Sequence, residues 1–132
     1  EMVRVLSPSG RILVADLLGS EDATKAQLHD RIEQLCDPTH VRALPESEMV
    51  RLFEEAGLGI ARRVPSTLDY ELDEWMAHGA PAKAAREEIV SLMESCLAED
   101  RAGLGVRREG GKLHFTHQAA VFVLELASRE GV

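Results

Sequence analysis

The sequence predicts an α/β domain. Two apolar runs, residues 12–15 and 119–126, have the nearly continuous apolar composition of buried strands. Between them, several segments space their apolar residues three or four positions apart, as one-sided helices do. Glycine and proline separate these segments at turns. The predicted order is strand, helix, helix, strand, helix, helix, hairpin and strand, with three or four strands in the sheet.

A turn at Ser7-Pro8-Ser9-Gly10 leads into the first predicted strand, residues 11–16. Proline presets φ at such a turn, and glycine supplies a positive φ. Residues 12–15 are apolar without interruption, which predicts a central strand covered on both faces in a parallel sheet. Residues 2–6 are typical of the end of a helix already under way, so we expect the chain to begin within a domain.

Two amphipathic helices follow this strand. The first is predicted over residues 23–35 and ends at Asp37-Pro38, because the residue before a proline disfavours helical geometry. The second is predicted over residues 45–56, and Gly57 stands where a left-handed helix cap belongs. The end of the second helix is the sharpest boundary in the sequence.

The second half of the chain is also predicted to contain both strands and helices. Residues 58–64 alternate between apolar and polar side chains and end at Pro65, as a half-covered or edge strand does. A short helix over residues 73–78 and a longer one from Pro81 come next, and Gly110-Gly111 marks a hairpin. Residues 119–126 form the last predicted strand.

Length, charge and cysteine content limit the class of protein. The chain has 132 residues and fits one domain or a large part of one. Its net charge is -8, with 15 basic and 23 acidic residues and no basic stripe, so we expect no nucleic-acid partner. The longest apolar run has six residues, against the roughly 20 that cross a bilayer, so we expect no membrane partner. Two widely separated cysteines favour reduced thiols in the cytoplasm.

The first predicted strand lies within a longer motif. Met2-Val3-Arg4-Val5-Leu6-Ser7-Pro8-Ser9-Gly10-Arg11, followed by Ile12-Leu13-Val14-Ala15-Asp16, resembles a segment of class I S-adenosylmethionine-dependent methyltransferases. That segment reads R-V-L-x-P-G-G-R, then a hydrophobic strand, then an acidic residue. Ser9 replaces the first of the usual two glycines. In that superfamily the segment enters the fifth strand of a seven-stranded Rossmann-like sheet.

A second segment narrows the resemblance. Asp37-Pro38-Thr39-His40-Val41-Arg42, then Leu52-Phe53-Glu54-Glu55-Ala56-Gly57-Leu58, is similar to two segments of the small-molecule branch related to ubiquinone and menaquinone methyltransferases. Those segments read D-P-S-H-V-R and L-x-x-A-G-F, so Thr39 and Leu58 depart from them mildly. Together the matching segments span residues 2–58.

The resemblance implies the C-terminal half of such a methyltransferase, with strands five, six and seven of the Rossmann-like sheet in a single partial domain over residues 1–132. The full enzyme would transfer a methyl group from S-adenosylmethionine to a small-molecule acceptor. The family binds its cofactor through a glycine-rich turn and an acidic residue after its first two strands. Neither is found in this sequence. We therefore expect no cofactor-binding residues here and no binding of S-adenosylmethionine by this chain alone.

Three residues are predicted to contact the acceptor, while the catalytic residues are not identified. Asp16 stands at the carboxyl end of the first strand, where open α/β sheets bind ligands, although it could equally cap the following turn. His40 and Arg42 could position or polarise the acceptor near Asp37. The alternative is a structural network in which Arg42 pairs with Asp37 and His40 caps a helix.

No metal site is predicted. His114 and His117 lie three positions apart, which places them on opposite faces of a strand. His29 and Glu33 lie four apart on one helical face and could face the substrate. A solvated polar face accounts for them better.

The cysteines and the tryptophan are assigned to the core. Cys36 and Cys96 lie near apolar helix stripes, where cysteine acts as a small hydrophobic residue. Trp75 and Met76 could line a hydrophobic substrate pocket, but an amphipathic core helix explains them as well. We favour the core.

Two hypotheses of function remain. The first is the acceptor side of a small-molecule methyltransferase, and the second is a stand-alone, non-catalytic α/β module for interaction or dimerisation. We also expect a homodimer, because residues 12–15 contain no proline or lysine to protect an open strand edge.

Overall fold

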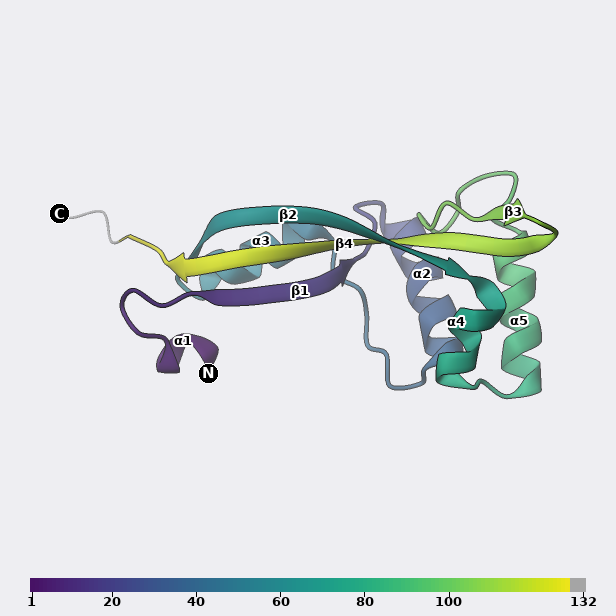
Figure 1. The fold of residues 1–132 in the computed structure, drawn as a ribbon, viewed down its shortest axis with the longest axis horizontal. Helices are drawn as coiled ribbons and strands as arrows, with labels where there is room; N and C mark the ends of the chain where they lie inside the picture. The colour runs from purple at the N-terminus through teal and green to yellow at the C-terminus, as the bar shows by residue number, and fades with distance from the viewer. Residues whose placement is uncertain (129–132) are drawn as a thin grey trace.

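The α/β class is confirmed in the computed structural model, which describes residues 1–128 (Figure 1). The strands are β1 (Ile12–Leu18), β2 (Leu58–Glu71), β3 (Arg107–Glu109) and β4 (Lys112–Leu126). The helices are α1 (Met2–Val5), α2 (Ala23–Cys36), α3 (Glu46–Glu55), α4 (Leu72–Gly79) and α5 (Lys83–Glu94).

The sheet is built around β4. Its order is β1-β4-β2, and β4 pairs antiparallel with both neighbours, so β1 and β2 run parallel to each other. The short strand β3 pairs with the beginning of β4 through a turn at Gly110 and Gly111, whose φ angles are 55° and 78°. Because side chains other than glycine rarely adopt such angles, the predicted hairpin is confirmed together with the reason for its two glycines.

The prediction of a central parallel strand at residues 11–16 is wrong for the described chain. The only partner of β1 within residues 1–128 is β4, and that pairing is antiparallel. Leu13 is 68% exposed, whereas Ile12 and Leu18 are buried. An unbroken apolar run shows that both faces of a strand can be buried. In β1 the described residues bury only one of the two faces.

Both long strands extend beyond their predicted ends. β2 continues through Pro65 to Glu71, and Pro65 lies opposite Ala120 on β4. Among residues 1–128 β2 lies at an edge of the sheet, as one of the two predictions had it, and an edge position explains why a residue without an N–H is tolerated there. The predicted hairpin strand and the predicted last strand are one continuous strand, β4.

The predicted helices are present with small changes at their ends. Asp22 caps α2, because its Oδ1 accepts hydrogen bonds from the backbone N–H groups of Thr24 and Lys25 at 2.9 and 3.0 Å. The longest helix, α2, has 14 residues. None of the helices within residues 1–128 combines the length and apolar composition needed to cross a membrane.

Two separate cores share β4. One core packs against α2, α4 and α5, and the other packs against α1 and α3, at the opposite end of the sheet in Figure 1. The buried positions of β4 change from odd to even numbers between the two cores. Since neighbouring side chains on a strand point to opposite faces, β4 buries opposite faces in its two halves. The buried residues are Leu113, Phe115 and His117 in the first half and Ala120, Phe122 and Leu124 in the second.

Candidate functional site

Asp16 lies within β1 rather than at its end, because the strand continues to Leu18. Its side chain is exposed, and its Oδ1 accepts a hydrogen bond from the backbone N–H of Leu17 at 2.8 Å. Asp16 also lines a mostly apolar pocket of about 360 Å³ with Ser66 and Leu68 of β2. It therefore combines a local backbone contact with access to a pocket.

His40 and Arg42 belong to the loop between α2 and α3, and each pairs with a helix. His40 Nε2 lies 2.9 Å from Asp30 Oδ1 of α2, and that oxygen also accepts the backbone N–H of Ala43 at 2.8 Å. Arg42 pairs with Glu48 of α3. Both residues thus have structural partners that fix the loop.

The predicted pairing of Arg42 with Asp37 is wrong. Asp37 Oδ1 instead accepts hydrogen bonds from the backbone N–H and hydroxyl of Thr39, at 2.9 and 2.7 Å. These bonds lower the pKa of the Asp37 carboxyl. A short side chain two residues away competes more effectively for Asp37 than an arginine five residues away.

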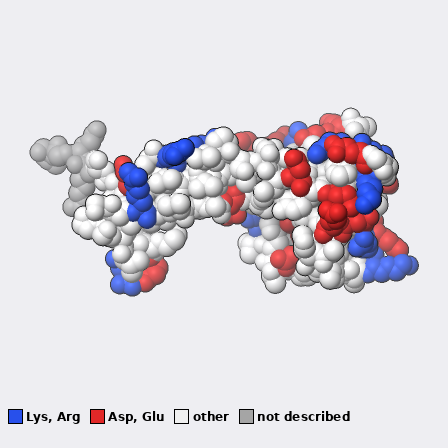
Figure 2. All heavy atoms as spheres, viewed as in Figure 1, with Lys and Arg blue, Asp and Glu red and all other residues white. Residues whose placement is uncertain are grey.

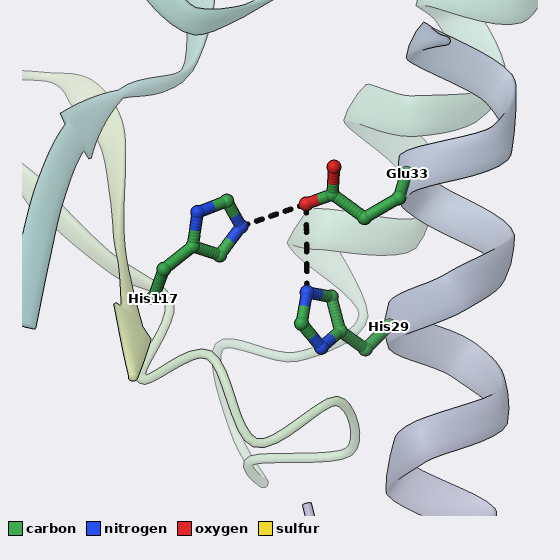
Figure 3. Close-up of side chains that lie close together, drawn as sticks. All are labelled: His29, Glu33 and His117. Atoms are coloured by element: carbon green, nitrogen blue, oxygen red, sulfur yellow. Dashed lines mark ion pairs between the residues drawn. The ribbon is translucent and has the colours of Figure 1, made fainter. Parts of the chain in front are cut away.

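A buried cluster that the sequence did not predict brings together His29, Glu33 and His117 (Figure 3). His117 Nε2 lies 2.7 Å from Glu33 Oε1, and His29 Nε2 lies 3.4 Å from the same oxygen. All three residues are at least nine-tenths buried. The expectation of a solvated polar face for His29 and Glu33 is therefore wrong, because His117 of β4 packs against that side of α2.

Aromatic rings surround the strand side of this cluster. The His117 ring centroid lies 5.1 Å from that of Phe115, 5.5 Å from that of Tyr70 and 6.3 Å from that of Trp75. Burial opposes the charged form of Glu33, but contact with His117 and His29 outweighs it and lowers the pKa of Glu33 to about 2. The cluster thus holds a carboxylate inside a largely apolar wall.

A pocket of about 480 Å³ adjoins the cluster. Glu33, Tyr70 and Trp75 belong to its wall as well as to the surroundings of the cluster. The wall is completed by residues from the ends of α2 and α4, namely Cys36, Asp37, Pro38, His78 and Gly79. Volumes in this range suit small organic ligands.

Trp75 and Met76 are both buried in the core around α2, α4 and α5, as favoured from the sequence. Trp75 has a second role, because it also lines the pocket of about 480 Å³. Cys36 and Cys96 are buried free thiols, and burial, aided by the negative charge of Glu33, raises the pKa of the Cys36 thiol. A raised pKa disfavours the thiolate, so the Cys36 thiol is not an activated nucleophile.

The cluster could have been suspected from one signal. His117 continues the odd-numbered buried face of Leu113 and Phe115, so a single long strand would have placed it in the core. Splitting β4 into two predicted strands hid that alternation. The separation in sequence between α2 and β4 conceals the contact itself.

Comparisons with known proteins show what this chain is similar to. No family model matches it. It is 26% identical over 110 residues to the uncharacterized protein YafE of Escherichia coli strain K12, and 27% identical over 101 residues to the uncharacterized methyltransferase YcgJ of Bacillus subtilis strain 168. These alignments cover 83% and 76% of this chain.

Two solved structures have the same fold over nearly the whole chain. A proposed methyltransferase of Bacillus halodurans C-125 matches 94% of this chain with a TM-score of 0.84 at 18% identity. The YcgJ structure from Bacillus subtilis matches 96% of it with a TM-score of 0.84 at 21% identity. The chain is similar in sequence to one protein named a methyltransferase and shares the fold of two methyltransferase structures. The resemblance to class I methyltransferases that was identified in the sequence is thereby confirmed, while the small-molecule branch and the C-terminal position stay predictions.

The chain spans only part of the length of the proteins that it matches. It spans 53% of YafE and 40% of YcgJ in the sequence alignments. It spans 59% and 56% of the two solved chains. The activity, substrates and partners of a whole methyltransferase are therefore matters for proposal.

Proposed function

We propose that this chain is the acceptor-side, C-terminal part of an S-adenosylmethionine-dependent methyltransferase that acts on a small molecule. The observation that carries the proposal is the fold match to two methyltransferase structures over 94% and 96% of the chain. In the proposed alignment β1, β2 and β4 are the fifth, sixth and seventh strands of the Rossmann-like sheet. Their mutual directions, two parallel strands separated by an antiparallel one, support that numbering.

The proposed acceptor site is the pocket of about 480 Å³ between the ends of α2 and α4. Tyr70 and Trp75 supply flat apolar surface, while Asp37 and His78 supply polar groups that could orient a small molecule. In this proposal His40 and Arg42 act through the loop that carries Asp37, because they fasten it to α2 and α3. Asp16 lines the other, mostly apolar pocket of about 360 Å³ and stays a proposed acceptor contact.

The described residues do not fit the cofactor. Gly103 and Gly105 have positive φ angles of 70° and 55°, but they follow a helix and a turn rather than a strand. A Cβ at Gly103 would meet the side chain of Ser20 at 3.4 Å, so this glycine faces protein rather than an open cradle. Within residues 1–128 no other glycine-rich turn follows a strand toward a helix. We propose that another part of the enzyme binds S-adenosylmethionine.

In this proposal the chain would position the acceptor and exclude water from the reaction. Its helices α2 and α4 would hold the acceptor against the cofactor-bearing part, so that the acceptor nucleophile meets the methyl group in line. The alternative, a non-catalytic interaction module, has the same fold but needs no ligand in the pocket.

Two measurements test the proposal. Isothermal titration of the 132-residue chain should show no binding of S-adenosylmethionine, and a micromolar dissociation constant would place the cofactor site in this chain. In the complete protein that contains the chain, Trp75→Ala should raise the acceptor KM or lower kcat while cofactor affinity stays unchanged. Absence of methyl transfer from the complete protein to any small-molecule acceptor would favour the interaction module.

A further inference from the structure

The cluster of His29, Glu33 and His117 converges on one point from two elements. His29 and Glu33 are four residues apart on α2, so they share one face of the helix, and His117 reaches them from β4 (Figure 3). One ligand atom from each residue lies within 4.8 Å of the other two. The separations from Glu33 Oε1 to the two Nε2 atoms are 2.7 and 3.4 Å.

The converging atoms are buried without directed partners among the described residues. His29 Nε2, Glu33 Oε1 and His117 Nε2 are closed to solvent, yet none has a hydrogen-bond partner of good geometry. Buried polar atoms are nearly always satisfied, because each unsatisfied one costs about 1–3 kcal/mol. Three such atoms at one point indicate that something else belongs between them.

The donor set has a specific chemistry. Two imidazole nitrogens and one carboxylate oxygen form the ligand set of several catalytic zinc sites, and the same set also binds other divalent first-row metals. Tetrahedral bonds of about 2.0 Å place ligand atoms roughly 3.3 Å apart. The two separations from Glu33 Oε1 lie on either side of that value, so small side-chain rotations would bring the ligands into position.

We propose that His29, Glu33 and His117 form a binding site for one divalent transition-metal ion of the zinc class. Three protein ligands leave a fourth position open, which is the arrangement of a catalytic rather than a structural zinc site. Glu33 also belongs to the wall of the pocket of about 480 Å³, so the site adjoins that pocket. A ligand held there would lie beside the ion.

The main competing explanation is a buried ion pair without metal, in which a protonated histidine neutralises Glu33. A pair of this kind needs one proton and one well-directed hydrogen bond, and it leaves the second imidazole without a partner. The metal explanation uses all three groups at once. It is also independent of methyl transfer, because it rests on the geometry of this chain alone.

The test uses the 132-residue chain without a histidine tag, stripped by a chelator and then desalted after exposure to zinc. Elemental analysis should find about one zinc per chain, and bound Co²⁺ should give visible absorption of low-symmetry coordination. Zinc should also raise the Tm of the chain, since a ligand of the folded state stabilises it.

Variants separate the site from other histidines. His117→Ala and Glu33→Gln should each weaken zinc binding by about 100-fold or more. His114→Ala is the matched control, because His114 lies half-buried on the same strand, 3.9 Å from Glu109. The zinc affinity of this variant should equal that of the wild-type chain. Glu33→Gln keeps the shape of the side chain and decides the matter if His117→Ala does not fold. Zinc at background level in the wild type, or equal loss in His114→Ala, would overturn the proposal.

Discussion

At the scale of single residues, Gly79 determines how closely the ends of α2 and α4 approach. A Cβ at this position would lie 2.5 Å from the backbone oxygen of Cys36 and 2.7 Å from its Sγ. Contacts this short force the two helix ends apart. The same glycine lines the proposed acceptor pocket, so packing and pocket shape depend on one missing side chain.

Gly79→Ala should lower the free energy of unfolding by about 1–3 kcal/mol, the usual range for forcing extra atoms into a packed site. Urea denaturation followed by circular dichroism measures it. Gly59→Ala on β2 is the control, since its Cβ would meet only the Cα of Ala127 at 4.0 Å. Equal free energies of unfolding for the two variants would show that the ends of α2 and α4 move apart without loss of stability.

At the scale of elements, α4 depends on Glu71, the last residue of β2. Glu71 Oε1 accepts the backbone N–H of Asp73 at 2.9 Å, and Oε2 lies 3.0 Å from Lys112 Nζ. The bond to Asp73, the hydrogen bond from Lys112 and its positive charge lower the pKa of Glu71 from its usual 4.5. A depressed folded-state pKa means that the carboxylate stabilises the fold above about pH 4.5 and that this contribution disappears as the pH falls through the lowered value.

We therefore expect Glu71→Gln to have a lower Tm than the wild type at pH 7, and Glu71→Ala a lower one still. Glutamine keeps an oxygen that can cap α4 but loses the charge that attracts Lys112, whereas alanine loses both. The gap between wild type and Glu71→Gln should close as the pH falls below 4.5. Thermal unfolding at a series of pH values measures this gap, and a gap that stays constant with pH would contradict the assignment.

Element types followed from local sequence, whereas pairings did not. Helices α2 and α3 and the glycine hairpin were predictable, because apolar spacing, Gly57 and Gly110-Gly111 act within a few residues. The length of β4 was not, because the polar residues around His117 interrupt its apolar run. A buried histidine contradicts the usual rule that polar residues face water, so the cluster with Glu33 depended on a tertiary contact that no local pattern contains.

At the scale of the whole molecule, the sheet ends in an open edge. No strand within residues 1–128 pairs with the outer side of β1, and Leu13 is 68% exposed beside it. Figure 2 shows few charged side chains over the β1 end of the sheet on the face in view, whereas acidic and basic groups gather around α4 and α5. Asp16 is the one charged residue of β1, and an unpaired strand edge with so little charge is a template for another strand.

We expect the chain to form a two-fold dimer through this edge in solution. Leu13→Lys should shift it to a monomer at tens of micromolar, because a buried lysine at the edge opposes pairing. Val41→Lys is the control, since Val41 is 82% exposed in the loop between α2 and α3. Analytical ultracentrifugation of wild type and variants is decisive, and a monodisperse 14.5 kDa wild-type chain would argue against the dimer.

The shared strand β4 has a consequence for how the molecule opens. Since one strand buries Phe115 in one core and Phe122 in the other, neither core can release its part of β4 without disturbing the backbone pairing of the other. Amide protons along β4 should therefore exchange with solvent deuterium through the same rare global opening, with one common free energy. Helix α5 is not part of the backbone pairing of the sheet, so we expect its amide protons to exchange with solvent faster than those of β4. Helix α5 can therefore open locally while β4, which carries residues of both cores, stays paired in the sheet.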